Sequence, residues 1–262
     1  MINKIKTLAY VIRKRNQGES SRVITLLTKE EGLVDVLVRG IRKPTYRYAG
    51  VMEPFNLTGV VLRPSQVYYM LDEATLVKSY GMLDDRLRGV GLGNVMLEVV
   101  NQAARDDDAG KYFDLLNDYL LAYENNQSDL DHRASILIFL SSFMMSVLAL
   151  AGRMPIVDGC WVCGLDRCGE WQATVGGLSH RSCLGNNMVC HSISNGAVEG
   201  LRVVSSQACG QLFEQSWSDK QAKEIFTIIL FWYHAFYERQ VKSLDFLDEV
   251  YRDMMSGRGE EK

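Results

Sequence analysis

The stretch Leu33–Arg39, L-V-D-V-L-V-R, decides the fold of the first part of the chain. Its apolar residues partly alternate with other residues, which is typical of a strand with one buried face. Gly32 precedes the stretch, and Gly40 with Pro44 follows it, so turn-forming residues bound it on both sides. The stretch therefore predicts a short, half-buried β-strand.

Four further segments of the first 80 residues have the same character. They are short, rich in Val, Ile, Leu, Thr and Tyr, and bounded by turn residues. The segments are Lys6–Lys14, Arg22–Lys29, Phe55–Arg63 and Val67–Lys78. Five short strands in this length suit a small closed barrel such as an OB-fold. An SH3-like barrel would give a similar pattern, so that alternative stays open.

The segment Arg39–Phe55 is basic and carries aromatic residues. It reads R-G-I-R-K-P-T-Y-R-Y-A-G-V-M-E-P-F, with cations at Arg39, Arg42, Lys43 and Arg47 and aromatic rings at Tyr46 and Tyr48. Gly40 and Pro44 break regular structure, which predicts a loop between two strands. A cationic loop with aromatic rings suits a phosphate backbone whose bases can stack. The alternative is an ordinary solvated surface loop.

Charge is distributed unevenly along the 262 residues, whose net charge is -3. Residues 1–80 carry 13 Lys and Arg against 7 Asp and Glu, whereas the remainder carries 16 against 25. A basic part joined to an acidic part is expected when one part meets nucleic acid. Arg13, Arg15 and Arg22 therefore join the loop residues as cations that would neutralise phosphates.

After residue 80 the apolar residues follow helical spacing. The predicted helices are Leu83–Arg105, Lys111–Glu124, His132–Leu150, Ser194–Ser206 and Asp219–Tyr237. Ser218 is the predicted N-cap of the last helix, because Gln221 follows it three residues later.

One predicted helix could in principle be a membrane-spanning segment, because residues 134–152 contain no charged residue over 19 positions. That length can span a bilayer. Four serines lower its hydrophobicity, no second such span exists, and a cysteine-rich segment follows directly. We interpret the run as a helix buried in a soluble bundle. The N-terminus shows no secretory signal, since its first 15 residues hold five cations and no apolar core of the required length.

The six cysteines all lie between Cys160 and Cys209, which suits a metal site in a reducing, cytoplasmic compartment. Cys160 and Cys163 form a C-x-x-C-G turn, and His180 and Cys183 follow a double glycine with H-x-x-C spacing. Two such pairs supply the four ligands of tetrahedral Zn²⁺. Four protein ligands leave no position for a catalytic water, so we expect a structural zinc.

Other ligand sets stay open, because loops can bring Cys168 or Cys190 to the place of Cys183 or His180. The alternative to a metal is that these cysteines are small buried hydrophobes, which is how we interpret Cys209. A zinc deaminase would carry H-x-E and P-C-x-x-C motifs, and neither occurs. The P-loop and the G-x-G-x-x-G, H-E-x-x-H and G-x-S-x-G motifs are also missing, so we expect no enzyme.

Four segments together resemble the RecO family of bacterial DNA repair and recombination mediators. They cover nearly the whole chain in the family's order. The segments are residues 18–32 (G-E-S-S-R-V-I-T-L-L-T through Gly32), residues 40–55 (G-I-R-K-P through P-F), residues 151–164 (A-G-R-M-P leading into C-W-V-C-G) and residues 242–247 (K-S-L-D-F-L). One departure is that His180-Arg181-Ser182-Cys183 stands where zinc-binding members usually carry a second C-x-x-C.

The resemblance implies an N-terminal OB-fold, a helical domain with an inserted zinc knuckle, and function without a catalytic site. It implies binding of single- and double-stranded DNA, annealing of complementary strands, cooperation with RecR, and help in loading RecA. It also implies that the helical domain binds the acidic-apolar tail of the single-stranded DNA-binding protein. Arg239 and Lys242 are the cations that we expect to hold this tail; an ordinary charged helix end is the alternative.

Taken together, the sequence predicts an α+β protein whose small N-terminal β-barrel precedes an all-helical domain. The predicted limits are 1–80 for the OB-fold DNA-binding domain, 81–255 for the helical domain, 158–191 for the zinc-binding insertion and 256–262 for a disordered tail. The predicted function is a cytoplasmic, nucleoid-associated DNA-binding mediator without membrane contact. The alternative is a zinc-ribbon adaptor that binds only proteins.

Overall fold

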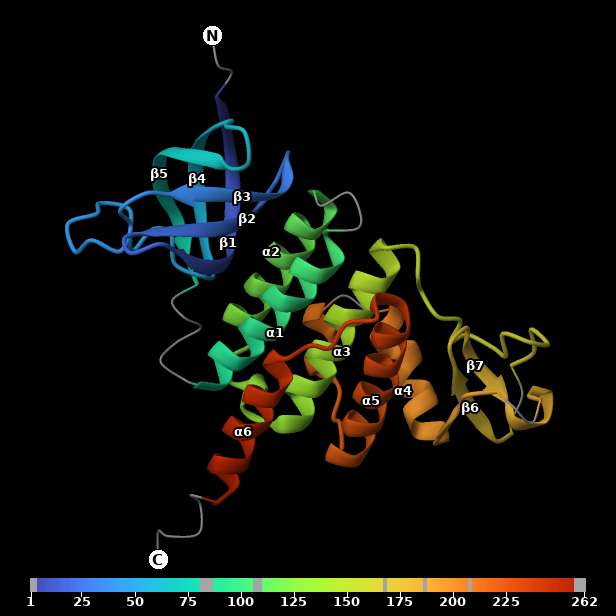
Figure 1. The fold of residues 1–262 in the computed structure, drawn as a ribbon. Coiled ribbons are helices and arrows are strands. Elements are labelled where there is room, and N and C mark those ends of the chain that lie inside the picture. The colour runs from blue at the N-terminus through green and yellow to red at the C-terminus, as the bar shows by residue number, and fades with distance from the viewer. Residues whose placement is uncertain are drawn as a thin grey trace, which may run out of the picture. The chain divides into compact units, whose positions relative to one another are not determined.

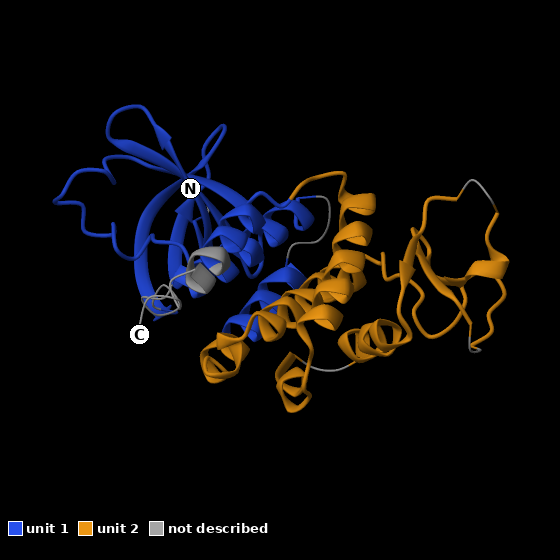
Figure 2. Ribbon diagram, turned by 90° about the horizontal axis from the view of Figure 1, so that it is seen from below, with its two compact units in different colours: residues 1–120, 241–262 blue, residues 121–240 orange. Residues whose placement is uncertain are grey.

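The structure of the chain is a computed structural model, in which residues 4–80, 87–105, 110–166, 169–185, 188–206 and 209–256 are described. The chain forms two compact units (Figure 2): residues 1–120 with 241–262, and residues 121–240. The predicted boundary at residue 80 and the predicted insertion at 158–191 stay predictions. The predicted disordered tail, 256–262, lies outside the described residues except for Ser256.

The first unit contains a closed barrel of five strands, at the predicted places in the sequence (Figure 1). The strands are β1 (Ile5–Gln17), β2 (Ser21–Thr28), β3 (Gly32–Val38), β4 (Asn56–Arg63) and β5 (Tyr69–Ser79). Their order around the barrel is β1-β2-β3-β5-β4, and only the short β3–β5 pairing is parallel. A strand β5 between β3 and β4 is the OB-fold arrangement, which confirms the predicted fold and decides against an SH3-like barrel.

The barrel core follows from the alternation seen in β3. Val34, Val36 and Val38 face inward and are buried, whereas Leu33, Asp35 and Leu37 are partly exposed. Two residues of the loop after β3 are also in this core. Its buried members are Ala9, Val11, Ile24, Leu26, Val34, Val36, Val38, Ile41, Met52, Val60, Leu62 and Ala74.

Three helices belong wholly or partly to the same unit: α1 (Leu87–Ala103), α2 (Gly110–Asn125) and α6 (Ser243–Ser256). The chain of α2 passes from the first unit to the second at residue 121. Helix α2 meets the barrel through β1. The hydroxyl of Tyr10 donates to the Asn117 side chain at 2.8 Å, and the Tyr10 ring lies 5.1 Å from that of Phe113.

Helix α6 is held against α1 by a carboxylate of α1. The Glu98 side chain accepts hydrogen bonds from the Ser243 N–H at 2.8 Å and the Ser243 hydroxyl at 2.6 Å, and from the Lys242 N–H at 3.1 Å. A carboxylate at a helix N-terminus satisfies N–H groups that the helix itself cannot pair. Helix α6 is not among the helices predicted from the sequence, although its first residues belong to the segment 242–247.

The second unit is built on α3 (Arg133–Leu150), α4 (Asn195–Ser206) and α5 (Asp219–Tyr237), with 3-10 turns η2 (Asp129–Asp131), η3 (Arg181–Cys183) and η4 (Cys209–Glu214). Helix α3 packs against α4 and α5. Among the described helices, α3 alone is long and apolar enough to cross a membrane, but 67% of that window is buried inside the protein, as in a core helix. The Gln221 N–H donates to the Ser218 hydroxyl at 3.3 Å, which confirms the predicted N-cap of α5.

Candidate metal centre and nucleic-acid surface

The cysteine-rich part of the chain, residues 156–193, is termed the metal segment below. It contains a three-stranded sheet in the order β7-β6-β8, formed by β6 (Trp171–Thr174), β7 (Gly177–His180) and β8 (His191–Ile193). The chain turns between β6 and β7 at Val175 and Gly176, so the double glycine supplies the predicted return turn. Gly177 has a φ of 133°, and a Cβ there would lie 2.2 Å from the Ile156 carbonyl oxygen, so no other residue fits.

The C-x-x-C-G turn is closed by backbone hydrogen bonds. The Gly164 N–H donates to the Cys160 carbonyl at 2.7 Å, and the Cys160 N–H donates to the Leu165 carbonyl at 3.0 Å. Gly164 has a φ of 72°, a left-handed conformation that glycine adopts without steric cost. The Trp161 N–H donates to the Leu178 carbonyl at 2.8 Å, which fixes the turn on β7.

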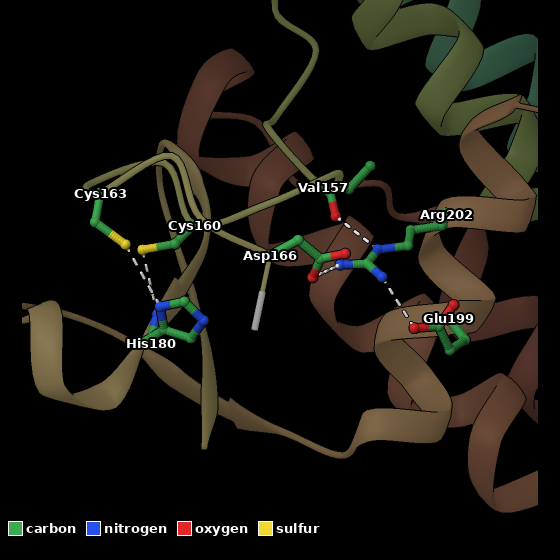
Figure 3. A network of polar contacts seen from close by, with 7 residues as sticks. All are labelled: Val157, Cys160, Cys163, Asp166, His180, Glu199 and Arg202. Atoms are coloured by element: carbon green, nitrogen blue, oxygen red, sulfur yellow. Dashed lines mark hydrogen bonds and ion pairs between the residues drawn. The ribbon is translucent and has the colours of Figure 1, made fainter. Parts of the chain in front are cut away.

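The four residues that the spacing predicts as ligands converge at one place. One ligand atom from each of Cys160, Cys163, His180 and Cys183 lies within 4.8 Å of all the others. His180 Nδ1 is 3.6 Å from Cys163 Sγ and 3.9 Å from Cys183 Sγ, and Figure 3 shows Cys160 and Cys163 turned toward this ring. The usual bond lengths of tetrahedral zinc imply separations of about 3.5–3.8 Å between ligand atoms. The Cys₃His set could therefore hold a metal ion.

The alternative ligand Cys190 does not join this cluster. Cys190 accepts a hydrogen bond from the Arg181 side chain at 3.7 Å and is not among the converging residues. Cys168 lies outside the described residues. His180 is buried, and its ring centroid lies 4.3 Å from that of Trp171, so its orientation is set by packing before any metal binds.

The surroundings of the thiols favour different protonation states. Burial would raise the pKa of Cys160, but N–H groups at Cys163, His180 and Val162 stabilise the thiolate and lower this pKa to about 6. Burial and the other thiols raise the pKa of Cys183. The thiolate is the form that binds a metal. The surroundings of Cys160 therefore favour the form that binds a metal, whereas those of Cys183 oppose it, and a bound cation would favour its thiolate.

The basic loop after β3 is folded back on the barrel. Tyr46 and Tyr48 are partly buried against the barrel core, with ring centroids 5.9 Å apart, and burial raises the pKa of Tyr46. The guanidinium carbon of Arg47 lies 4.4 Å from the centroid of the Tyr48 ring. Each ring is therefore already partly covered by packing, while Arg39, Arg42, Lys43 and Arg47 are exposed.

Arg42 attaches this loop to the turn between β1 and β2. Its N–H donates to the Ser20 carbonyl at 3.0 Å, and its guanidinium donates to the Gly18 carbonyl at 3.3 Å. The strands that enter this turn carry the other predicted cations, Arg13, Arg15 and Arg22, of which the first two are exposed and Arg22 is partly buried. Arg42 thus links the basic loop to a turn whose flanking strands carry three further predicted cations.

Tyr68 is an aromatic residue outside the predicted DNA-binding set. It lies in the loop between β4 and β5, where its hydroxyl accepts a hydrogen bond from Arg15 at 3.3 Å and its ring lies 5.8 Å from the Arg15 guanidinium carbon. The sequence placed Tyr68 inside the segment Val67–Lys78 and so read it as a strand residue. The signal that could have found it is general: OB-folds bind ligands with the loops after β1 and after β4.

The two predicted tail-binding cations lie in different compact units. Arg239 follows α5 in residues 121–240, whereas Lys242 precedes α6 in residues 241–262. Both side chains are exposed. A joint site for a peptide tail stays a prediction.

Comparison with known families assigns the chain. The family model described as recombination protein O N terminal matches residues 1–80, and the model described as recombination protein O C terminal matches residues 85–245. The chain belongs to the RecO family. The resemblance found in the sequence is thereby confirmed over nearly the whole length of the chain.

Individual RecO relatives are similar over shorter or longer stretches. A DNA repair protein RecO from Thermoanaerobacter sp. is 28% identical over 161 residues, covering 61% of this chain and 62% of the relative. One from Anaeromyxobacter dehalogenans is 32% identical over 166 residues, covering 62% and 63%. These alignments thus span less than two thirds of either relative. One from Pelotomaculum thermopropionicum is 24% identical over 246 residues, covering 93% of both chains.

Proposed function

We propose that this RecO-family chain is a DNA-binding recombination mediator in DNA repair, with no catalytic step of its own. One observation supports the proposal: Arg42 joins the basic loop to the β1–β2 turn, so two segments that carry cations meet there. Family membership supports a role in DNA repair, because the relatives carry that name. The proposed function requires only side chains that hold DNA. It requires no group that alters the covalent bonds of DNA.

The proposed DNA surface comprises nine residues. They are Arg13, Arg15, Arg22, Arg39, Arg42, Lys43, Tyr46, Arg47 and Tyr48. The cations would neutralise phosphates and release counterions, which makes binding sensitive to salt. Tyr46 and Tyr48 are half-covered by the barrel, so stacking on a base would use the remaining ring faces. Annealing requires only that two strands come together with their repulsion screened, and a surface that reads no bases suffices.

The partners follow from the family resemblance. We propose that the chain binds single- and double-stranded DNA, works with RecR, and helps to load RecA on DNA covered by the single-stranded DNA-binding protein. Arg239 and Lys242 are the proposed contacts for the acidic tail of that protein, and they are best changed one at a time because they belong to different units. The proposed location is the bacterial cytoplasm, at the nucleoid.

The Cys₃His cluster is proposed to hold a structural Zn²⁺ ion. Cys160, Cys163, His180 and Cys183 would fill all four tetrahedral positions, leaving none for a reacting water. The ion would then cross-link the C-x-x-C-G turn to β7 and η3 and would supply no chemistry to a substrate.

A salt titration tests the DNA surface. Changing Arg42, Lys43 and Arg47 together to Ala should weaken binding to oligo-dT, and should reduce the slope of log K against log salt by roughly 2 if all three contact phosphates. The matched control removes three exposed cations elsewhere, Lys29, Lys220 and Lys223, and should leave the slope nearly unchanged. Equal affinity and slope for the loop variant and the unchanged protein at low salt would reject this surface.

The second candidate is an adaptor that binds proteins and not DNA. The observation in its favour is that several apolar side chains of the metal segment face solvent. A groove there is lined by Trp161, Thr174, Val175, Gly176, Met188 and Val189. Fluorescence titration with oligo-dT separates the two candidates, because only the mediator should bind at low salt.

A further inference from the structure

Arg202 on α4 reaches out of its helix to the metal segment. Its Nε donates to the Val157 carbonyl at 3.1 Å, and its Nη2 donates to the Asp166 carboxylate at 2.7 Å. The remaining amino group, Nη1, donates to Glu199 on the same helix at 3.0 Å. Figure 3 shows the guanidinium between these three acceptors, on the side of the C-x-x-C-G turn away from the sulfur atoms.

The two contacts of Arg202 with the metal segment bracket the first ligand pair. Val157 lies three residues before Cys160, and Asp166 lies three residues after Cys163. The chain between them forms the turn that presents both thiols. A single side chain therefore fixes the entry and the exit of this turn relative to α4.

Arg202 also contacts the residue that orients the histidine. Its guanidinium carbon lies 6.0 Å from the centroid of the Trp171 ring, and that ring lies 4.3 Å from the His180 ring. Trp171 and His180 are both buried and face each other in the register of β6 and β7. Three of the four ligands thus depend on elements that Arg202 contacts.

We propose that Arg202 is the positioning residue of the metal site. It holds the C-x-x-C-G turn and, through Trp171, the His180 imidazole in the geometry that a tetrahedral ion requires. The proposal rests on the proposed zinc site and adds a residue that offers no ligand atom itself. Residues that orient metal ligands raise affinity because the site need not be ordered when the ion binds.

The geometry explains why arginine suits this position. A planar guanidinium presents five N–H donors in fixed directions, so it can serve a carbonyl and two carboxylates at once. A lysine ammonium is a point charge on a flexible stem. The Arg202 side chain is only 21% exposed, so its contacts are less screened by water than those of an ordinary surface ion pair.

The test is the zinc affinity of the purified full-length protein, measured by competition with a zinc-binding indicator. Arg202→Gln should weaken zinc binding roughly 10- to 100-fold, the usual effect of removing a group that orients metal ligands. Arg202→Lys should give an intermediate loss. Glu199→Gln is the matched control, because it removes the charge of the acceptor on α4 and leaves both contacts with the metal segment, so its zinc affinity should equal that of the protein without substitutions.

Cobalt spectroscopy distinguishes positioning from ligation. At saturating Co²⁺, Arg202→Gln should keep the tetrahedral absorption of the Cys₃His set, whereas Cys163→Ser should change it. Asp166→Asn should weaken zinc binding by itself and add less than its full effect to Arg202→Gln, because both changes remove a charge from the same ion pair. Circular dichroism checks that the helices persist in each variant. If Arg202→Gln fails to fold, the zinc affinities of Asp166→Asn and Glu199→Gln are compared instead.

The outcomes separate the two proposals. Tight zinc binding that neither Arg202→Gln nor Asp166→Asn changes would overturn the role of Arg202 and leave the zinc site intact. An unchanged protein that binds neither Zn²⁺ nor Co²⁺ would overturn the zinc site and this role with it. A loss confined to Arg202 and Asp166 variants, with an unchanged cobalt spectrum, supports the proposal.

Discussion

The barrel and the metal segment are both small β-structures, but different interactions hold them in place. The barrel strands are 7 to 13 residues long, close on themselves, and surround a core of buried apolar side chains. The strands of the metal segment are 3 or 4 residues long. Several of its large apolar side chains face solvent, among them Trp161, Leu165 and Val189.

The difference between the barrel and the metal segment shows which interactions each sequence provides. In the barrel, alternation such as that of Val34, Val36 and Val38 places a strand face in the core, and hydrophobic burial supplies the stability. In the metal segment, Trp171, Ala173 and Leu178 are also buried, and the sequence adds ligands and anchors. Trp232 of α5 donates to the Thr174 carbonyl at 2.6 Å, Arg202 holds the turn, and the Cys₃His residues converge at one place.

Metal removal should have the largest effect on folding stability. The loss should be confined to the metal segment. Zinc binding contributes about 10 kcal/mol or more to the folding of small zinc domains. A chelator should therefore abolish hydrogen-exchange protection of the Trp161 N–H and the Leu178 N–H, while the barrel keeps its protection. Cys163→Ser should act in the same way, and Cys190→Ser, outside the cluster, is the control. Unchanged protection after complete chelation would show that packing alone holds the segment.

A cavity in the barrel core should have the next largest effect on stability. Only the barrel should be destabilised. Leu26 on β2 is fully buried, so Leu26→Ala should lower the free energy of unfolding by about 2–5 kcal/mol. Leu76→Ala, at a position 45% exposed on β5, is the control and should cost much less. Zinc content should stay the same in both variants. A parallel loss of zinc in Leu26→Ala would mean that the two regions fold as one.

The same contrast explains what the sequence could predict. Alternation and turn residues placed the five barrel strands, and ligand spacing named the four residues that converge, because both signals are local. The strands β6 to β8 are too short for a periodic pattern, so the sheet of the metal segment was not predicted. Arg202 lies 36 and 45 residues from its partners Asp166 and Val157, so no local pattern reveals that contact. The DNA contacts of the barrel stay predictions.

Two aromatic residues, the partly buried Tyr68 and the exposed Trp161, compare the two regions by their contribution to DNA binding. If the barrel binds DNA, Tyr68→Ala should weaken oligo-dT binding by about 1–3 kcal/mol, the usual contribution of a base-stacking ring. Trp161→Ala in the metal segment should leave that affinity unchanged. Tyr68→Phe is the control, since it keeps the ring and loses only the hydroxyl that Arg15 contacts. A loss in Trp161→Ala but not in Tyr68→Ala would move the DNA surface away from the barrel.

The smallest effect on the free energy of unfolding should come from an ion pair that joins the barrel strands. This contribution should depend on pH. Asp72 on β5 lies 2.9 Å from Lys4, just before β1, and 3.3 Å from Arg63 on β4. The hydrogen bond from Lys4 is the main reason that the pKa of Asp72 lies below its usual value; burial opposes this shift, and the hydrogen bond from Arg63 adds to it. The unfolded chain therefore binds the proton more tightly than the folded chain does.

Stability from Asp72 should accordingly be complete above the ordinary carboxyl pKa of about 4 and should be lost as pH falls through the lower folded value. Because the groups are partly exposed, Asp72→Asn should cost less than about 1 kcal/mol at pH 7. Urea unfolding of both proteins at falling pH measures this, with Glu73→Gln as the control on the same strand. The two curves should converge in strong acid. A constant difference down to the lowest pH would mean that Asp72 acts through packing and not through its charge.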